Sequence, residues 1–162
     1  MLVASRWLDD TNFGESVVLL LEVGDAGAMG VIVNRPTSTT VAAALPQLPM
    51  FAGRDERLFA GGPVSATQPL FLAASSPSAA DARELVADEV FLLTEQDSIA
   101  LALETGAVRV LLGYAGWGPG QLEAELARSA WHLVPGSGRW VFAEDSLGLW
   151  QKLLDVIFLP TA

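Results

Sequence analysis

The segment with the clearest capacity for chemistry is a glycine-rich stretch at residues 113–120, where four glycines stand among eight residues. A strand-like apolar run precedes it, and Pro119 suits the first turn of a helix that follows. Glycine lets a ligand approach the backbone closely, and the free N–H groups of a helix start favour an anion. The alternative is a tight turn in which Trp117 fills the core. The candidate ligand-binding residues here are Gly116, Trp117, Gly118, Gln121 and Glu125.

Two shorter motifs also follow apolar runs. Asn34-Arg35-Pro36 places a lone cation beside the end of an expected strand, although an exposed and solvated Arg35 is the alternative. Gly61-Gly62-Pro63 is typical of a turn that needs special φ values, and it would equally allow a ligand to approach.

We expect these three loops to meet and form one polar-rimmed site, because ligands often bind where strands end. Arg35 would offer a charged fork to a carboxylate or phosphate, and the amides before Gln121 would face the same anion. Glu125 would act as a general base if a reaction exists, but no catalytic residue is assigned. The rival interpretation is that the loops are separate structural turns.

Composition limits the chemistry that is available. The chain of 162 residues has no cysteine and one histidine, His132, so thiolate catalysis and the common zinc sites are excluded. The 113–120 stretch lacks the lysine of a phosphate-binding loop and the spacing of a dinucleotide-binding loop. We therefore predict neither a metal nor a cofactor.

The charge pattern indicates which classes of partner the protein can bind. The net charge is −10 and the few cations are scattered, which argues against direct binding of nucleic acid. The longest apolar runs are too short to span a membrane, and no N-terminal signal is visible, so we expect a cytoplasmic protein. Only 17% of the residues are charged, which favours a protein partner or self-association.

Hydrophobic periodicity and turn residues predict an α+β (mixed α/β) fold, with largely antiparallel, mixed sheets flanked by helices in one compact domain over residues 1–162. The pattern predicts helices at residues 39–45, 95–104, 119–130 and 147–158. It predicts a hairpin of strands at 16–23 and 28–34, further strands at 58–60, 69–74, 89–93, 107–112 and 139–142, and a loop at 75–80.

The three loops, in this order, resemble the AlgH/YqgE family of bacterial proteins. The resemblance also includes Phe13 and the Ser16-Val17-Val18 run in the first strand, and it extends over nearly the whole chain. Its most specific part is the Gly113-Tyr114-Ala115-Gly116-Trp117-Gly118 string, with Trp131 and Trp150 further on. The resemblance implies a compact α+β domain and a family usually labelled as transcriptional regulators, without established catalytic residues.

Two positions depart from the family pattern. Family members often carry histidines where this chain has Val23 and Leu72, so we do not expect a mechanism that needs either imidazole. We expect a non-enzymatic regulatory or interaction protein that acts without direct DNA contact. The alternative is a small-molecule or anion-binding protein, or a hydrolase, that uses a pocket of the three loops.

Overall fold

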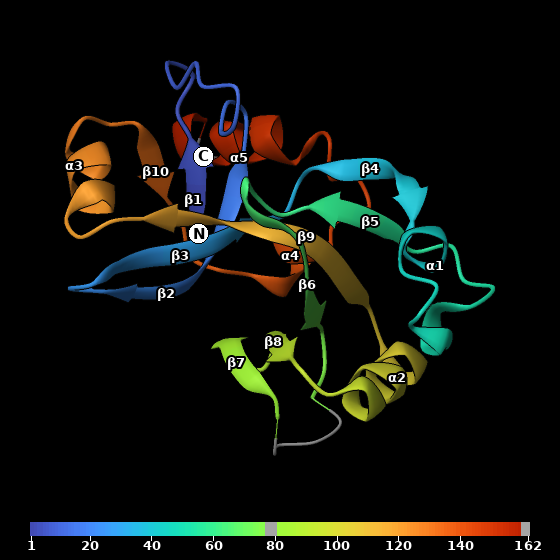
Figure 1. Cartoon of the computed structure of the whole chain (residues 1–162). Coiled ribbons are helices and arrows are strands. Elements are labelled where there is room, and N and C mark those ends of the chain that lie inside the picture. Colours follow the sequence, from blue (N-terminus) through green and yellow to red (C-terminus); the bar gives the residue numbers. More distant parts are fainter. Residues whose placement is uncertain (77–80, 160–162) are drawn as a thin grey trace.

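The structure is a computed structural model that describes residues 1–76 and 81–159. Its strands form one curled sheet in the order β10-β1-β2-β3-β9-β6-β8-β7, and β5 also pairs with β9 and carries β4 (Figure 1). The strands are β1 (Leu2–Ala4), β2 (Val17–Gly24), β3 (Gly27–Ile32), β4 (Pro36–Thr40), β5 (Arg57–Ala60), β6 (Val64–Ala73), β7 (Arg83–Val86), β8 (Val90–Leu93), β9 (Val108–Trp117) and β10 (Trp131–Leu133).

Strand β9 is the centre of the sheet. Its first half pairs with β6 on one side and with β5 on the other, and its last residues pair with β3. The β5–β9 pairing is parallel, whereas the other pairings between described strands are antiparallel. Gly113 lies at the change of partners and has a φ of 77°, a conformation that glycine adopts without strain.

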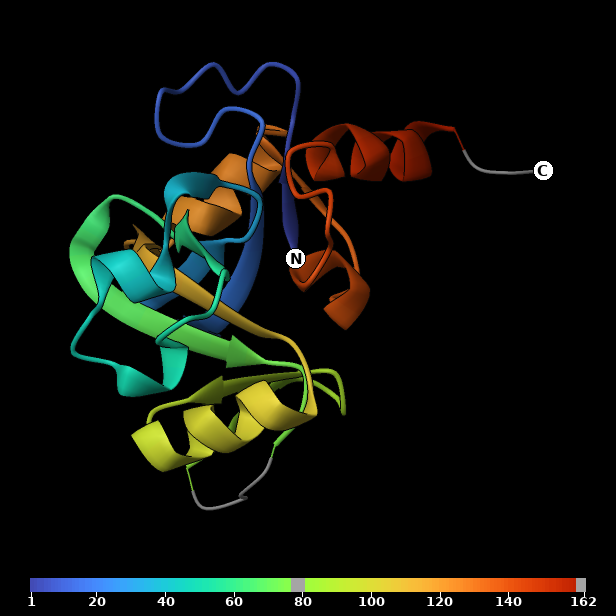
Figure 2. The same ribbon diagram turned by 90° about the vertical axis from the view of Figure 1, so that its right-hand side faces the viewer.

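The helices are short and lie around the sheet. They are α1 (Val41–Ala44), the 3₁₀ turn η1 (Pro49–Phe51), α2 (Gln96–Thr105), α3 (Gln121–Ala127), α4 (Gly138–Val141) and α5 (Leu149–Phe158). Helix α5 packs against β1 through Leu149, Leu153 and Leu154, which are buried because they recur on one helical face. Figures 1 and 2 show α2 at the opposite end of the molecule from α5.

Much of the predicted fold is confirmed. The chain is a mixed α/β structure with largely antiparallel pairing, although strands dominate and form one sheet rather than several. The predicted hairpin is the β2–β3 pair, which closes at Gly24 opposite Gly27. The assignment of a single domain to residues 1–162 stays a prediction, and the predicted loop at 75–80 lies partly outside the described residues.

Two local predictions are wrong. Residues 139–142, predicted as a strand, belong largely to α4, where the amides of Trp140 and Val141 both donate to the Ser137 carbonyl. A helical turn buries both of these side chains, whereas a strand would turn one of them to the opposite face. The glycine-rich stretch is also not a loop throughout, because β9 continues to Trp117. The short strands β1, β4, β7 and β10 were not predicted from the sequence.

Candidate functional site

The Gly61-Gly62 loop lies beside the Asn34-Arg35 loop and against β9. The Ala60 amide donates to the Arg35 carbonyl at 2.9 Å, and the Ile32 amide donates to the Gly61 carbonyl at 2.8 Å. A Cβ on Gly61 would overlap the Gly113 carbonyl, and a Cβ on Gly62 would overlap the backbone of the residue that follows Gly113. These glycines are therefore needed because three segments of backbone approach closely.

Asn34 and Arg35 are occupied by contacts to the chain itself. The buried Asn34 accepts the Val17 amide at 2.9 Å and donates to the Glu15 carbonyl at 2.9 Å. The guanidinium of Arg35 donates to the carbonyls of Asn12 and Gly14, so it holds the loop that precedes β2. Burial lowers the pKa of Arg35, and nearby Asp10 opposes that shift.

Trp117, Gln121 and Glu125 form a second, separate network. One oxygen of the Glu125 carboxylate accepts the indole N–H groups of Trp117 and Trp131, both at 2.9 Å. Its other oxygen accepts the Gln121 amide at 3.1 Å, and Gln121 accepts the Gly118 amide at 3.0 Å. Trp117 is buried, so the indole ring fills the core as the alternative interpretation proposed.

The predicted site residues therefore fall into two groups. Ala28 of β3 pairs with Trp117, whereas Asn34 lies six residues further along the chain, or about 20 Å in an extended strand. Phe13 stacks on Trp117 in the same loop that Arg35 holds, so the groups are linked through that loop. A pocket of about 430 Å³ is lined by Asn34 and Arg35 but by none of the other seven predicted residues. That the nine residues bind one ligand stays a prediction.

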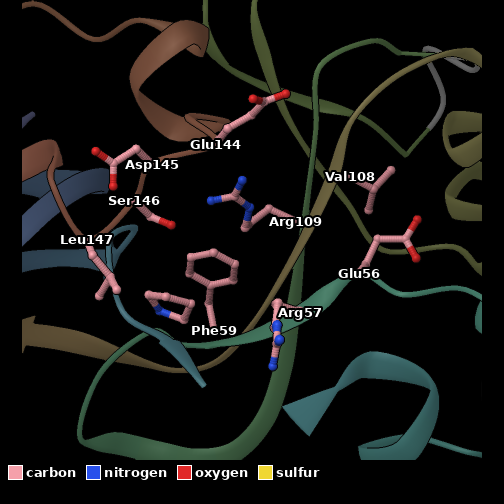
Figure 3. Close-up of a pocket in the computed structure, with 10 residues that line it drawn as sticks. Glu56, Arg57, Phe59, Val108, Arg109, Glu144, Asp145, Ser146 and Leu147 are labelled. Carbon is pink, nitrogen blue, oxygen red and sulfur yellow. The ribbon is translucent and has the colours of Figure 1, made fainter. Parts of the chain in front are cut away.

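A different cavity lies between the β4–β5 pair, β9 and the segment that leads into α5 (Figure 3). It has a volume of about 350 Å³, and we call it the Arg109 pocket. Pro36, the last residue of the Asn34-Arg35-Pro36 motif, contributes to its wall. The lining residues are Pro36, Glu56, Arg57, Phe59, Val108, Arg109, Glu144, Asp145, Ser146 and Leu147.

Arg109 is the central group of this pocket. Its guanidinium carbon lies 4.1 Å from the centre of the Phe59 ring, and Nη2 donates to the Ala143 carbonyl at a long 3.4 Å. Nη1 is shielded from solvent and has no hydrogen-bond partner among the described residues. Because burial removes water from the charged group, the pKa of Arg109 falls to about 10.

Ser146 presents a second free donor to the same space. The residue is only 6% exposed, and its hydroxyl makes no hydrogen bond with the part of the chain that the structure describes. Figure 3 shows the hydroxyl turned toward Arg109 and the guanidinium turned toward the segment that carries Ser146. The carboxylates of Glu144 and Asp145 extend away from the guanidinium in the same view. Arg109 and Ser146 thus contribute unpaired donors to the wall of this cavity, and the same wall contains a buried unpaired acceptor, Oε2 of Glu56.

Sequence reasoning missed Arg109 because a single polar residue in a short apolar strand carries no motif. The usable signal was its place between Val108 and Val110, both buried, in a strand where an exposed cation is not expected. Ser146 had no such signal. Among the described residues no cluster of three metal-ligating side chains occurs, and no helix is long and apolar enough to cross a membrane.

Comparisons with known proteins agree on one family. The domain family DUF179, described as AlgH-like, matches residues 1–160. A UPF0301 protein of Streptomyces coelicolor is 39% identical over 163 residues, which cover 95% of this chain and 83% of the relative. A UPF0301 protein of Rhodococcus jostii is 34% identical and covers 100% of this chain and 83% of its own length.

Two solved structures share the fold. The solution structure of the AlgH protein from Pseudomonas aeruginosa matches with a TM-score of 0.77 and 33% identity, covering 99% of this chain and 87% of that protein. A crystal structure of a Corynebacterium diphtheriae protein matches with a TM-score of 0.83 at 22% identity, covering 98% and 86%. The resemblance stated from the motifs is confirmed, and this chain belongs to the AlgH-like UPF0301 family.

Proposed function

We propose that this protein binds a small molecule through an anionic oxygen group, such as a carboxylate, in the Arg109 pocket. The observation that carries the proposal is the shielded Nη1 of Arg109, which has no acceptor among the described residues. A buried charged donor without a partner costs free energy, and a bound ligand that accepts its hydrogen bond would offset that cost. The Ser146 hydroxyl supplies a second donor at the same place.

The proposal assigns a supporting role to the loops that the motifs singled out. Asn34, Gly61 and Gly62 hold the ends of the strands from which Pro36 and Phe59 reach the pocket. We infer binding without a reaction, because no histidine lies beside Ser146 to act as its general base. The one histidine of the chain, His132, lies in β10 and contacts Phe158 edge-on at 5.1 Å.

The test is calorimetric titration with benzoate and with neutral benzamide as its uncharged analogue. Benzoate is expected to bind and benzamide is not, and an Arg109→Met variant is expected to lose benzoate binding. Arg128→Met is the matched control, because it removes one exposed cation at the end of α3 and leaves the pocket intact. Equal binding of benzoate to the two variants would refute the proposal, as would a failure of wild type to bind benzoate, propionate and 4-methylpentanoate alike.

A regulatory or interaction role in the cytoplasm is the second candidate function. Its support is a group of exposed apolar residues on α5 and the adjoining edge strand β10, namely Leu133, Val156, Phe158 and Leu159, each more than half exposed. Figure 2 shows α5 extending outward beyond the sheet. Light scattering at high protein concentration tests self-association through this surface. A larger mass in wild type that Phe158→Ser reduces would support it, and a clean monomer in both would count against it.

A further inference from the structure

The charges around the Arg109 pocket restrict the kind of anion that fits there. Arg57 and Arg109 are outnumbered by the carboxylates of Glu56, Glu144 and Asp145. Glu144 and Asp145 are exposed, and the ion pairs found among the described residues, Arg54–Glu56 and Arg83–Glu22, involve neither of them. Because Arg54 neutralises Glu56, the carboxylates of Glu144 and Asp145 balance the charges of Arg57 and Arg109, and this balance disfavours a ligand with two or three negative charges.

The two carboxylates and the hydroxyl that line the pocket lie on one short segment. Glu144, Asp145 and Ser146 are consecutive, so the two carboxylates lie beside the hydroxyl that faces Arg109. The buried Ser146 is fixed in place, and the Asp145 carboxylate is held by the Gly148 amide at 3.0 Å. The Glu144 side chain is exposed and makes no hydrogen bond or ion pair with the described residues, so it is free to turn. A second cavity of about 350 Å³ shares Glu144 and Asp145 as its wall, so these side chains border open space on both sides.

We propose that the ligand is a small zwitterion of the α-amino acid type. This inference rests on the anion binding proposed above and adds the cationic group. Arg109 and Ser146 bind the carboxylate of the ligand, Glu144 turns to face its ammonium group, and Asp145 adds a second negative charge beside it. Leu147, Pro36 and Val108 provide apolar surface for the remainder of the ligand. The pairing cancels charge on both partners, which a carboxylate without the ammonium group does not achieve.

The experiment compares each amino acid with its deaminated acid by calorimetric titration. The pairs are alanine with propionate, leucine with 4-methylpentanoate and phenylalanine with 3-phenylpropionate, and inorganic phosphate is a further probe. In wild type we expect at least one amino acid to bind about tenfold tighter than its partner, which corresponds to about 1.4 kcal/mol. Phosphate is expected to bind more weakly than that amino acid.

Variants separate this inference from the proposal on which it rests. The double variant Glu144→Gln with Asp145→Asn should bind an amino acid and its deaminated acid with about equal affinity. Arg109→Met should abolish binding of both members of a pair. The Asn side chain retains the oxygen that accepts the Gly148 amide at 3.0 Å. Asp25→Asn with Glu104→Gln is the matched control, since it removes two exposed carboxylates elsewhere.

The outcomes are distinct. Equal binding of amino acid and deaminated acid in wild type, lost in Arg109→Met, would overturn the zwitterion and leave anion binding intact. Tighter binding of phosphate than of every amino acid would also overturn it. If neither member of any pair bound, or if Arg109→Met bound them unchanged, both proposals would fail. A preference that survived loss of Glu144 and Asp145 would show that these carboxylates do not face the ammonium group.

Discussion

Replacement of Arg109 by Met should stabilise the protein in the absence of ligand. The wild-type side chain holds a positive charge in a poorly hydrated place without a carboxylate partner among the described residues. Met has a similar length, carries no charge and packs well against an aromatic ring such as Phe59. A residue kept for binding at a cost to stability is expected to behave in this way.

The size of the effect follows from the pKa. Burial lowers the pKa of Arg109 well below the ordinary Arg value, to about 10, and one pKa unit corresponds to about 1.4 kcal/mol. The cost of the charge is therefore about 3 kcal/mol at most, and we take about 2 kcal/mol because the side chain is partly exposed. Loss of the contact with the Phe59 ring costs about 1 kcal/mol. The net stabilisation of about 1 kcal/mol should raise the melting temperature by about 2–4 °C.

The assay is urea unfolding and thermal melting of wild type, Arg109→Met and the Arg128→Met control at neutral pH. Below about pH 10 the guanidinium is charged in both folded and unfolded chains, so the advantage of Arg109→Met should be constant. Between the folded and the unfolded pKa the unfolded chain binds more protons, so wild type gains stability as the pH rises and the advantage shrinks. A variant less stable than wild type by about 1 kcal/mol or more would refute the reasoning and make Arg109 a structural residue.

Three further predictions concern the rest of the fold. Glu125→Ala should lower the free energy of unfolding by at least about 3 kcal/mol in urea, because it leaves two indole N–H groups without their acceptor; a loss below about 1 kcal/mol would contradict the network. Gly62→Ala should cost about 3 kcal/mol or more, since its Cβ would overlap backbone, whereas Gly120→Ala at a φ of 75° meets open space and should cost about 1 kcal/mol; similar costs for the two would show that close approach is not the cause. Asp81, whose pKa is lowered first by the Ser98 hydroxyl, contributes stability that is present above the ordinary Asp pKa and lost as the pH falls through the folded value. Asp81→Asn should therefore have a lower melting temperature than wild type at neutral pH, and the difference should disappear in acid. A difference that does not depend on pH would argue against this role of the Asp81 carboxylate.

The family and the central strands were accessible from the sequence because their signals are local. The β2–β3 hairpin follows from two apolar runs joined by a glycine-containing turn, and the start of β9 follows from its apolar alternation. Helix α5 follows from apolar residues at helical spacing. Each of these patterns lies within about ten neighbouring residues, so no knowledge of distant contacts was needed.

The glycine motifs were recognised as special, but their purpose was decided by the tertiary structure. Gly61 and Gly62 are required because β5 runs parallel to β9 and leaves it at Gly113, so distant segments of backbone touch. Trp117 and Glu125 hydrogen-bond to each other, because β9 continues through the glycine-rich stretch and directs the indole inward. A one-dimensional pattern cannot distinguish a glycine that admits a ligand from one that admits another strand.

By itself the sequence determined the family, most of the strands and the acidic, apolar character of the chain, all of which depend on composition and on neighbours in the chain. Only the tertiary structure decided where the free cation lies. Arg109 is shielded by Phe59 from β5 and faces Ser146 from the segment before α5, and neither neighbour is near it in sequence. Desolvation and a missing partner are properties of that three-dimensional surrounding, because they depend on which distant segments exclude water from the guanidinium and on which acceptors those segments fail to supply.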